Sequence, residues 1–383
     1  MNQRTAILVT GATGFIGGRI CERIVQAGFN NVRALVHDSV NAPRIARLPI
    51  QMCQGDLMHA HSLKNALENC KIVFHLGLGP GRGIATGTRN LLKAAATVGV
   101  ERIVHISTTA VYGLKPPPYA TSEDIRPHRT GNEYSDYKLA AEGIVRQFMS
   151  RGLPIVILRP SIVIGPYSQW SVGIVNQLRQ GTYLLIDDGV GLCNTTYVDN
   201  LVDAMWLAVE KPEAVGQIFT ITDGDRVTWG EFIRAHASML RIEPRFENVS
   251  SEDISRHYNS QPGAIRASLK ATRRVLASSE LRRLLKQIPI ADRILSWAWC
   301  KTQGMTEIEK QRLRKRLSGD RFSAILHKAP PMPEAGRAEI ETVDVLFSIE
   351  KARRLLGYSP RVHFPEAMQR TEQWLRFANF LSS

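Results

Sequence analysis

Residues 10–17 read Thr-Gly-Ala-Thr-Gly-Phe-Ile-Gly and stand between a short apolar run, Ala6–Thr10, and an amphipathic segment. In such a turn Gly11 permits a tight bend, Gly14 lets the backbone approach a pyrophosphate, and Gly17 lets helix and strand pack closely. The start of the helix also offers unpaired N–H groups and the positive end of its dipole to phosphate oxygens. The pattern predicts a dinucleotide site. Its predicted contacts are Gly11, Thr13, Gly14, Phe15, Ile16 and Gly17.

Strand-like and helix-like segments alternate through the first half of the chain. This rhythm of apolar runs and amphipathic stretches indicates a parallel sheet covered on both faces by helices. We predict strands at 6–10, 32–36, 50–54, 72–76, 102–107 and 154–158, and helices at 89–98 and 133–149.

The regular alternation of strands and helices becomes weaker beyond residue 170. Thr228 and Glu231 form a capping-box pattern in front of a helix that begins at Trp229. Gly357 and Pro360 are stop signals behind another helix. The remaining predicted elements are helices at 172–180, 198–209, 348–356 and 365–377, and a strand at 217–222.

The predicted fold class is α/β, a Rossmann-type doubly wound parallel sheet with a smaller, mainly helical C-terminal substrate domain. We place the dinucleotide-binding domain at 1–225, with part of 166–196 contributing to the substrate site. Residues 226–383 would form the C-terminal substrate-binding region, with a basic helical insertion at 250–328.

The composition is that of an ordinary globular protein, with 383 residues, 44% apolar and 22% charged. Five cysteines without a CxxC pair predict reduced thiols and no metal site. No basic leader precedes a long apolar run, and no stretch reaches the ~20 apolar residues of a membrane span. We therefore expect a cytoplasmic protein.

The net charge of +14 is unevenly distributed, because residues 245–328 hold 18 Lys or Arg against 8 Asp or Glu. Such a region could attract nucleotide phosphates, an anionic membrane surface or nucleic acid, or could simply be a solvated helical face. A basic amphipathic stretch at 265–316, with Trp297 and Trp299, could rest on a membrane surface. The expected partner is a small-molecule substrate, and no nucleic acid is expected.

In such a fold, the residue at the end of the second strand contacts the cofactor ribose. An acidic residue there would bind both ribose hydroxyls and repel a 2′-phosphate, but the strand ends at Val36. His37, with Arg33 or Arg44 nearby, could face a phosphate instead, which favours NADP over NAD, although Asp38 could still reach the ribose. After the third strand, Asp56 could meet the adenine amino group, followed by Leu57.

Tyr134 and Lys138 stand four residues apart, on one face of a predicted helix. A nearby cation stabilises a phenolate and lowers the pKa of a tyrosine, which makes Tyr134 a candidate general acid or base for interconverting an alcohol and a ketone. Upstream, hydroxyl groups follow the fifth strand, at the edge where parallel sheets bind ligands. Thr108 is our first candidate for holding the substrate oxygen and Ser107 the second.

Five stretches carry a family resemblance: TGATGFIGG from residue 10, GTRNLLKAA from 87, HISTTAVYG from 105, YSDYKLAAE from 134 and ILRPSIVIGP from 157. Together they resemble the extended short-chain dehydrogenases/reductases of the NAD-dependent epimerase/dehydratase superfamily. The resemblance covers about residues 5–235 and returns at 355–376. Other segments, TTYVDNLVDA and GQIFTITDGDRVTWGEF, resemble 3β-hydroxysteroid dehydrogenases.

The resemblance implies an NAD- or NADP-dependent enzyme that forms a homodimer. It gives Thr108 as the catalytic hydroxyl, Tyr134 as the acid or base and Lys138 as the ribose-binding lysine. Arg159-Pro160-Ser161 would lie beside the nicotinamide. The implied cofactor contacts beyond the glycine turn are His37, Asp56, Leu57, Ser107, Tyr134, Lys138, Pro160 and Ser161.

Two departures from the family bear on the substrate. Ile84 stands where the family often has asparagine, three residues before the Gly87-Thr88 pair. The segment 75–87 is short and glycine-rich, with Arg82 as its charged group, where relatives carry a longer substrate loop. Both departures count against nucleotide-sugar specificity.

Three functions therefore compete. The first is a nucleotide-sugar epimerase; a 4,6-dehydratase is disfavoured because Thr109 and Ala110 replace the acidic pair that it needs. The second is a 3β-hydroxysteroid or sterol-type dehydrogenase, or another ketone reductase. The third is a non-catalytic dinucleotide-binding protein, which would not need Tyr134 and Lys138.

Overall fold

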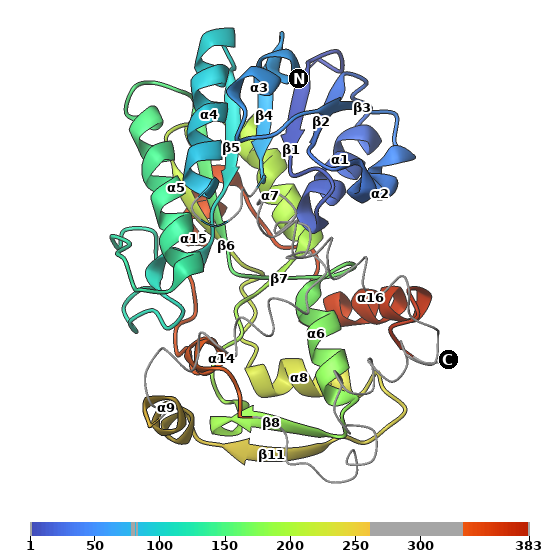
Figure 1. Cartoon of the computed structure of the whole chain (residues 1–383), viewed down its shortest axis with the longest axis vertical. Helices are drawn as coiled ribbons and strands as arrows, with labels where there is room; N and C mark the ends of the chain where they lie inside the picture. The colour runs from blue at the N-terminus through green and yellow to red at the C-terminus, as the bar shows by residue number, and fades with distance from the viewer. Residues whose placement is uncertain (1, 78–80, 82, 261–331, 382–383) are drawn as a thin grey trace, which may run out of the picture. The chain divides into compact units, whose positions relative to one another are not determined.

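A computed structural model describes residues 2–77, 81, 83–260 and 332–381 (Figure 1). The chain divides into two compact units, residues 1–251 with 334–383, and residues 252–333. The first unit holds every element discussed below except most of α9 (Ser251–Asn259), which is the described helix of the second. The basic segment 265–316 lies outside the described residues, and so do Trp297, Trp299 and most of the predicted insertion.

The first unit is built around a parallel sheet of seven strands in the order β10-β6-β5-β4-β1-β2-β3. β1 pairs with β2 on one side and with β4 on the other, so the strand order reverses there. A ligand crevice opens at such a reversal, outside the carboxyl ends of the strands. The strands are β1 Ile7–Thr10, β2 Val32–Val36, β3 Gln51–Gln54, β4 Ile72–His75, β5 Arg102–Ile106, β6 Ile155–Pro160 and β10 Ile218–Ile221.

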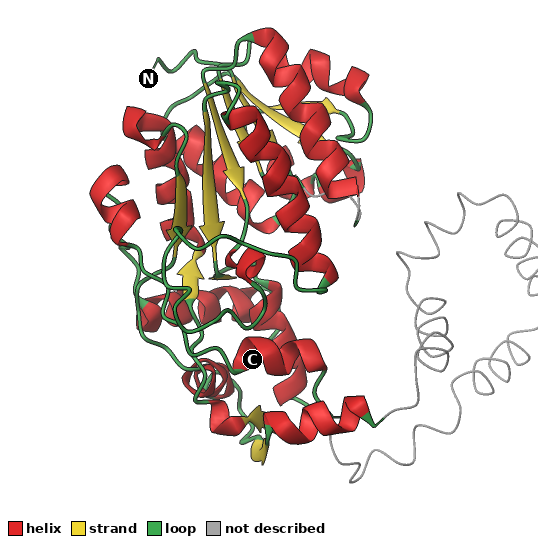
Figure 2. Ribbon diagram, turned by 90° about the vertical axis from the view of Figure 1, so that its left-hand side faces the viewer, coloured by secondary structure: helices red, strands yellow, loops and turns green. Residues whose placement is uncertain are grey.

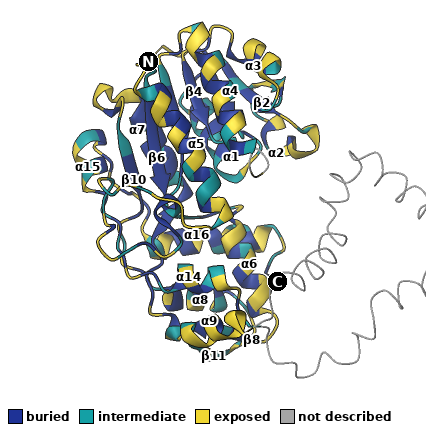
Figure 3. Ribbon diagram, turned by 60° about the vertical axis from the view of Figure 1, so that its left-hand side comes forward, coloured by how far each residue is buried: buried dark blue, intermediate teal, exposed yellow. Residues whose placement is uncertain are grey.

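Helices cover both faces of this sheet (Figure 2). On β5, Val104 and Ile106 belong to the core under α1 and α7, whereas Ile103 belongs to the core under α3, α4 and α5. Both faces are therefore apolar, and the strands are buried throughout the middle of the unit (Figure 3). The helices are α1 Phe15–Gln26, α3 Ala60–Leu67, α4 Gly83–Val98, α5 Glu133–Met149, α7 Val198–Glu210 and α15 Glu350–Leu356.

A second group of elements packs around its own core, which contains Trp229, Phe232 and Tyr183. The capping box at Thr228 is confirmed: Glu231 N donates to Thr228 Oγ1 at 3.1 Å, and Thr228 N donates to Glu231 Oε2 at 2.7 Å. This group comprises β7 Ile162–Ile164, β8 Thr182–Ile186, β9 Thr195–Tyr197, β11 Arg245–Val249, α6 Gln169–Leu178, α8 Trp229–Ala237, α14 Ala335–Glu341 and α16 Phe364–Phe377.

Short elements complete the unit, namely α2 (Pro43–Ala46) and four 3₁₀ turns, of which η1 (Ser39–Asn41) and η2 (Thr109–Tyr112) border the crevice. The predicted Rossmann-type sheet is confirmed, whereas the domain boundary predicted at residue 225 stays a prediction. Within the described ranges no helix combines the length and hydropathy needed to cross a bilayer.

Candidate active site

The glycine turn has the geometry that its sequence predicts. Gly11 has φ +70°, and a Cβ there would lie 2.9 Å from Gly77 N. A Cβ on Gly17 would lie 2.0 Å from Gly11 O, so the first helix can meet the turn only without a side chain. Within the described chain no side chain caps α1 at Gly14, and its first turn has no acidic residue. The backbone N–H groups there suit a pyrophosphate.

A buried histidine ties this turn to the next strand. His75 Nδ1 lies 2.8 Å from Thr10 Oγ1, and His75 Nε2 lies 3.1 Å from Thr88 Oγ1 on α4. Gly77 N donates to Thr10 Oγ1 at 3.0 Å. Burial lowers the pKa of His75 to about 3, so its ring stays neutral. No sequence pattern indicated this bridge, which fixes the end of β4 under the glycine turn.

Of the predicted contacts at the adenosine end, His37 is exposed, Asp56 is half-buried and Leu57 is buried. Asp56 Oδ2 lies 3.5 Å from His37 Nε2 and 3.2 Å from His59 Nδ1. Asp38 caps η1, because its carboxylate accepts a hydrogen bond from Val40 N at 3.0 Å. Leu57 is 9% exposed. A Cβ on either neighbouring glycine, Gly77 or Gly87, would lie within 2.9 Å of its side chain.

The two arginines proposed to face a phosphate are separated by the structure. Arg33 Nη1 donates to Ala66 O at 3.2 Å and to Glu68 O at 2.6 Å, so its guanidinium closes the end of α3. Of the two alternatives for an arginine near His37 at a cofactor phosphate, Arg33 is therefore contradicted. Arg44 Nη1 lies 3.2 Å from Phe15 O, beside the glycine turn, and its guanidinium stacks 4.0 Å from the Tyr167 ring centroid.

Tyr134 and Lys138 lie one turn apart on α5, as predicted. Lys138 is 4% exposed, and its Nζ donates to Ile106 O at 2.8 Å, at the carboxyl end of β5. Thr108 follows that strand, and its Oγ1 accepts a hydrogen bond from Ala110 N at 3.2 Å. The Thr108 hydroxyl can therefore donate to the Tyr134 oxygen, with which it forms a hydrogen bond.

The pKa of Tyr134 differs from our prediction. Burial of the phenol end raises the pKa of Tyr134 above its ordinary value, and the hydrogen bond with Thr108 lowers it in part. The side chain as a whole is 48% exposed. The expectation that Lys138 keeps this phenol acidic is wrong, because burial is the largest effect on its pKa and disfavours the phenolate.

Two residues expected beside the cofactor turn away from the crevice. Ser107 Oγ donates to Glu142 Oε2 at 2.7 Å and is buried. Arg159 is fully buried and pairs with the same carboxylate. Ser107 is therefore not available as the second candidate for the substrate oxygen. Pro160 ends β6, and Ser161 reaches the cavity described next.

A cavity of about 330 Å³ lies over Tyr134. Its polar lining residues are Thr108, Thr109, Tyr134, Ser161 and Asn194, and most of the other lining side chains are apolar. The Trp170 and Trp229 rings lie 5.8 Å apart, and Trp229 Nε1 donates to Ile340 O at 3.1 Å. No sequence pattern indicated the aromatic walls of this cavity, because they come from segments far apart in the sequence. The apolar lining residues that matter below are Trp170, Leu192, Trp229, Val343 and Phe347.

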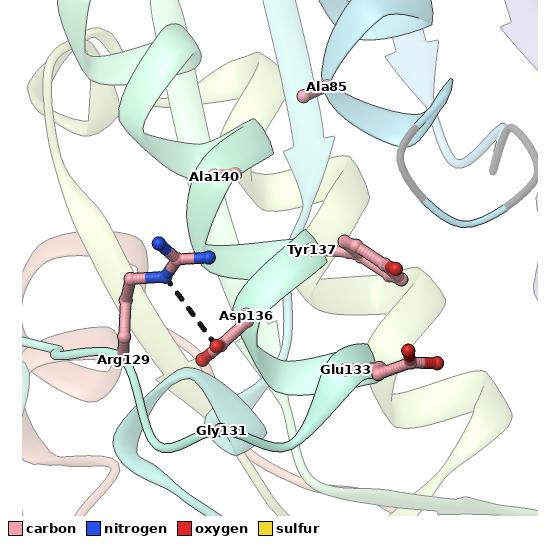
Figure 4. Close-up of a pocket in the computed structure, with 7 residues that line it drawn as sticks. All are labelled: Ala85, Arg129, Gly131, Glu133, Asp136, Tyr137 and Ala140. Carbon is pink, nitrogen blue, oxygen red and sulfur yellow. Dashed lines mark ion pairs between the residues drawn. The ribbon is translucent and has the colours of Figure 1, made fainter.

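A second concavity, of about 410 Å³, lies on the other side of α5 (Figure 4). Arg129 Nε lies 3.5 Å from Asp136 Oδ2 at the edge of this concavity. Glu133 and Tyr137 project together from another side of the helix. Neither Tyr134 nor Lys138 lines it. Tyr137, which shares the motif of Tyr134 and Lys138, lines this second concavity.

The doubly wound sheet and the glycine turn define a dinucleotide-binding enzyme of the Rossmann class. The sequence profile of the NAD dependent epimerase/dehydratase family matches residues 7–222, and the chain belongs to this family. Its relatives include NAD-dependent epimerases and reductases, and the chain is an enzyme of that kind.

The proteins that are similar to this chain are named for different substrates. A 4-hydroxy-2-methyl-3-oxo-4-farnesyl-3,4-dihydroquinoline-1-oxide ketoreductase of Stigmatella aurantiaca is 29% identical over 63% of this chain and 75% of its own. The uncharacterized protein YbjS of Escherichia coli K12 is 25% identical over 97% of both chains. A UDP-glucuronic acid 4-epimerase from Bacillus cereus, solved with NAD, is 18% identical, with a TM-score of 0.66 over 98% of this chain and 99% of its own.

Proposed function

We propose that the enzyme transfers a hydride between a nicotinamide cofactor and an apolar ketone or secondary alcohol, with Tyr134 as the acid or base. The observation that carries this proposal is the cavity over Tyr134. Thr108 and Tyr134 line a space whose larger side chains are mostly apolar, with Ser161, Thr109 and Asn194 as its other polar lining residues.

The same cavity bears on the substrate class. Among the described residues that line it there is no lysine or arginine. A nucleotide diphosphate needs cations or helix N-termini to replace its hydration, whereas an apolar body gains about 25 cal/mol for each Å² removed from water. The volume of about 330 Å³ is in the range of small-molecule sites. The lining therefore favours a ketone on an apolar skeleton over a sugar nucleotide.

The protein groups would act as follows. In reduction, the Tyr134 hydroxyl donates its proton to the substrate oxygen while the carbonyl carbon receives a hydride, so that a ketone becomes an alcohol. With its pKa raised by burial, the Tyr134 phenol holds its proton at neutral pH and donates it as the substrate oxygen gains negative charge. Thr108 holds the same oxygen, and Lys138 holds a ribose hydroxyl. When bound, the nicotinamide supplies the hydride.

The test is an assay of purified enzyme with reduced cofactor and two probes, an apolar 3-oxo ester or 3-ketosteroid and UDP-glucuronic acid. Consumption of reduced nicotinamide with the apolar ketone supports the proposal. Isomerisation of the sugar nucleotide without net consumption of cofactor would instead establish an epimerase.

That epimerase is the second candidate, supported by the similarity of the whole chain to the UDP-glucuronic acid 4-epimerase structure. We propose NADP as the preferred cofactor in either case. The support is Arg44 beside the glycine turn, together with the use of Asp38 as a cap rather than a ribose ligand. A homodimer, a membrane contact through 265–316 and a cytoplasmic location stay predictions.

A further inference from the structure

A buried chain of polar side chains lies next to Lys138, and the proposed function gives it no role. Glu142, one turn further along α5, has no exposed surface. Its carboxylate accepts hydrogen bonds from Ser107 Oγ at 2.7 Å and from Arg159 Nε at 3.0 Å. Arg159 Nη2 donates to the second carboxylate oxygen, so the pair is bidentate.

Arg159 connects this carboxylate to the turn after β5. Its Nη1 donates to Tyr112 Oη, and its guanidinium carbon lies 4.8 Å from the Tyr112 ring centroid. The Tyr112 hydroxyl donates to Ser122 O at 3.2 Å, and its ring stacks on Phe347 with centroids 6.0 Å apart. Tyr112 ends η2, which begins directly after Thr108. These hydrogen-bonded side chains thus connect α5 to the segment that carries Thr108.

We infer that Glu142 and Arg159 are positioning residues for the proposed acid/base site, because their buried ion pair fixes the helix of Tyr134 and Lys138 against the turn of Thr108. The inference rests on the roles proposed above for those three residues. Breaking one partner of a buried pair leaves an uncompensated charge, so the geometry is held firmly only while both partners remain.

The charge on Glu142 also acts on Lys138. Burial lowers the pKa of Lys138 to about 8, and the Glu142 carboxylate raises it. Burial holds the pKa of His75 at about 3 and that of His105 well below its ordinary value, so both rings are neutral in a neutral assay. Glu142 therefore supplies the negative charge that favours the ammonium. The other ionisable groups facing this part of α5 are Tyr112, Arg146 and Arg159.

Two substitutions separate charge from packing. Glu142→Gln keeps the shape and removes the charge, whereas Glu142→Asp keeps the charge and shortens the side chain. In the Gln variant Lys138 loses its proton at lower pH, so the alkaline limb of ketone reduction should move down by about one pH unit. The Asp variant should keep that limb near the wild-type position. If both variants lose thermal stability and neither moves the limb, the pair is only structural and the inference is overturned.

Two milder substitutions test the inference if the Glu142→Gln variant does not fold. Tyr112→Phe removes the hydroxyl that Arg159 holds but keeps the ring. Tyr358→Phe is the matched control, because Tyr358 is 1% exposed and its hydroxyl donates to Thr222 O at 3.0 Å, away from the cavity. We expect a several-fold fall in kcat for Tyr112→Phe alone, with cofactor Kd unchanged. An equal kcat in the two variants contradicts the inference.

The proposed function and this inference can fail separately. A Tyr134→Phe enzyme that still turns over would remove the acid/base assignment itself. An inactive Tyr134→Phe enzyme, combined with an unmoved alkaline limb in Glu142→Gln, would remove only the positioning role.

Discussion

Asn194 holds the backbone of Phe347 against the cavity, although the two residues are far apart in the sequence. Its Oδ1 accepts a hydrogen bond from Phe347 N at 3.0 Å, and its Nδ2 donates to Val345 O at 2.8 Å. Asn194 is 4% exposed, so water cannot replace either bond easily. One amide therefore fixes a wall of the proposed substrate site.

Asn194→Asp should weaken substrate binding. The new carboxylate cannot donate to Val345 O and is buried, which costs about 1–3 kcal/mol of unfolding free energy and loosens the Phe347 wall. KM for an apolar ketone should rise while cofactor Kd stays constant. Asn200→Asp is the control, since Asn200 also bonds Val362 O and N away from the cavity; this variant should lose more stability, because Asn200 also donates to Asp223 Oδ1 at 2.8 Å. A comparable rise in KM for both variants would deny the special role of Asn194.

Tyr134→Phe should abolish turnover and leave cofactor binding intact, because the ring stays and only the acidic proton is lost. Rates with the apolar ketone and cofactor Kd from fluorescence titration are the two measurements. Tyr137→Phe, which alters the second concavity, should keep near-normal activity. Residual turnover of Tyr134→Phe at wild-type level would refute the assignment.

Trp170→Ala should raise KM for apolar ketones more steeply as their hydrophobic part grows. The ring is one wall of the cavity and packs on Trp229. Losing its contact area removes about 25 cal/mol for each Å² no longer buried by the substrate. Trp206→Ala on α7, whose Nε1 donates to Glu210 Oε1, controls for general loss of an indole. A KM series that does not depend on substrate length would argue against an apolar site.

Arg44→Ala should lower the preference for NADPH over NADH, whereas Arg33→Ala should not. Arg44 lies beside the glycine turn, but Arg33 closes α3 and should affect mainly stability. The ratio of kcat/KM for the two cofactors is the measurement, with thermal unfolding as the companion. Equal ratios in wild type and Arg44→Ala would withdraw the proposed NADP preference.

Mild acid should stabilise the fold through Asp223. Burial raises the pKa of Asp223 from about 3.8 to about 6. Between these values the folded state binds more protons than the unfolded state, so unfolding free energy falls as pH rises through this window. The wild type should therefore gain about 1–3 kcal/mol between pH 7 and pH 4 relative to Asp223→Asn. Parallel pH profiles of stability in the two proteins would contradict this.

Strong local signals explain what the sequence predicted well. The strand Val32–Val36 and the helix Glu133–Met149 have the predicted bounds, since an apolar run and a long amphipathic pattern each specify their element. Short β9 was missed because Thr195 and Thr196 carry no apolar alternation. The direction of Arg33 was missed because it depends on which face of the sheet the side chain enters.

The cavity itself could not be predicted. Its walls meet through long-range packing, and the contact between Asn194 and Phe347 is made to backbone atoms, which leave no periodic trace in the sequence. Thr108, Tyr134 and Lys138 could be predicted as site residues because they lie in two short motifs, HISTTAVYG and YSDYKLAAE. The pKa of Tyr134 was misjudged because helix spacing places Lys138 on the same face but does not reveal how far burial disfavours the phenolate.

The placement of Phe347 also orders events during synthesis. A ribosome delivers the glycine turn, the seven strands and Tyr134 well before it reaches residue 347, and nascent domains tend to fold from their N-terminal end. The dinucleotide crevice can thus form on the emerging polypeptide while the proposed substrate cavity still lacks the side chain of Phe347. On the proposed function, only the completed polypeptide can enclose a substrate over Tyr134.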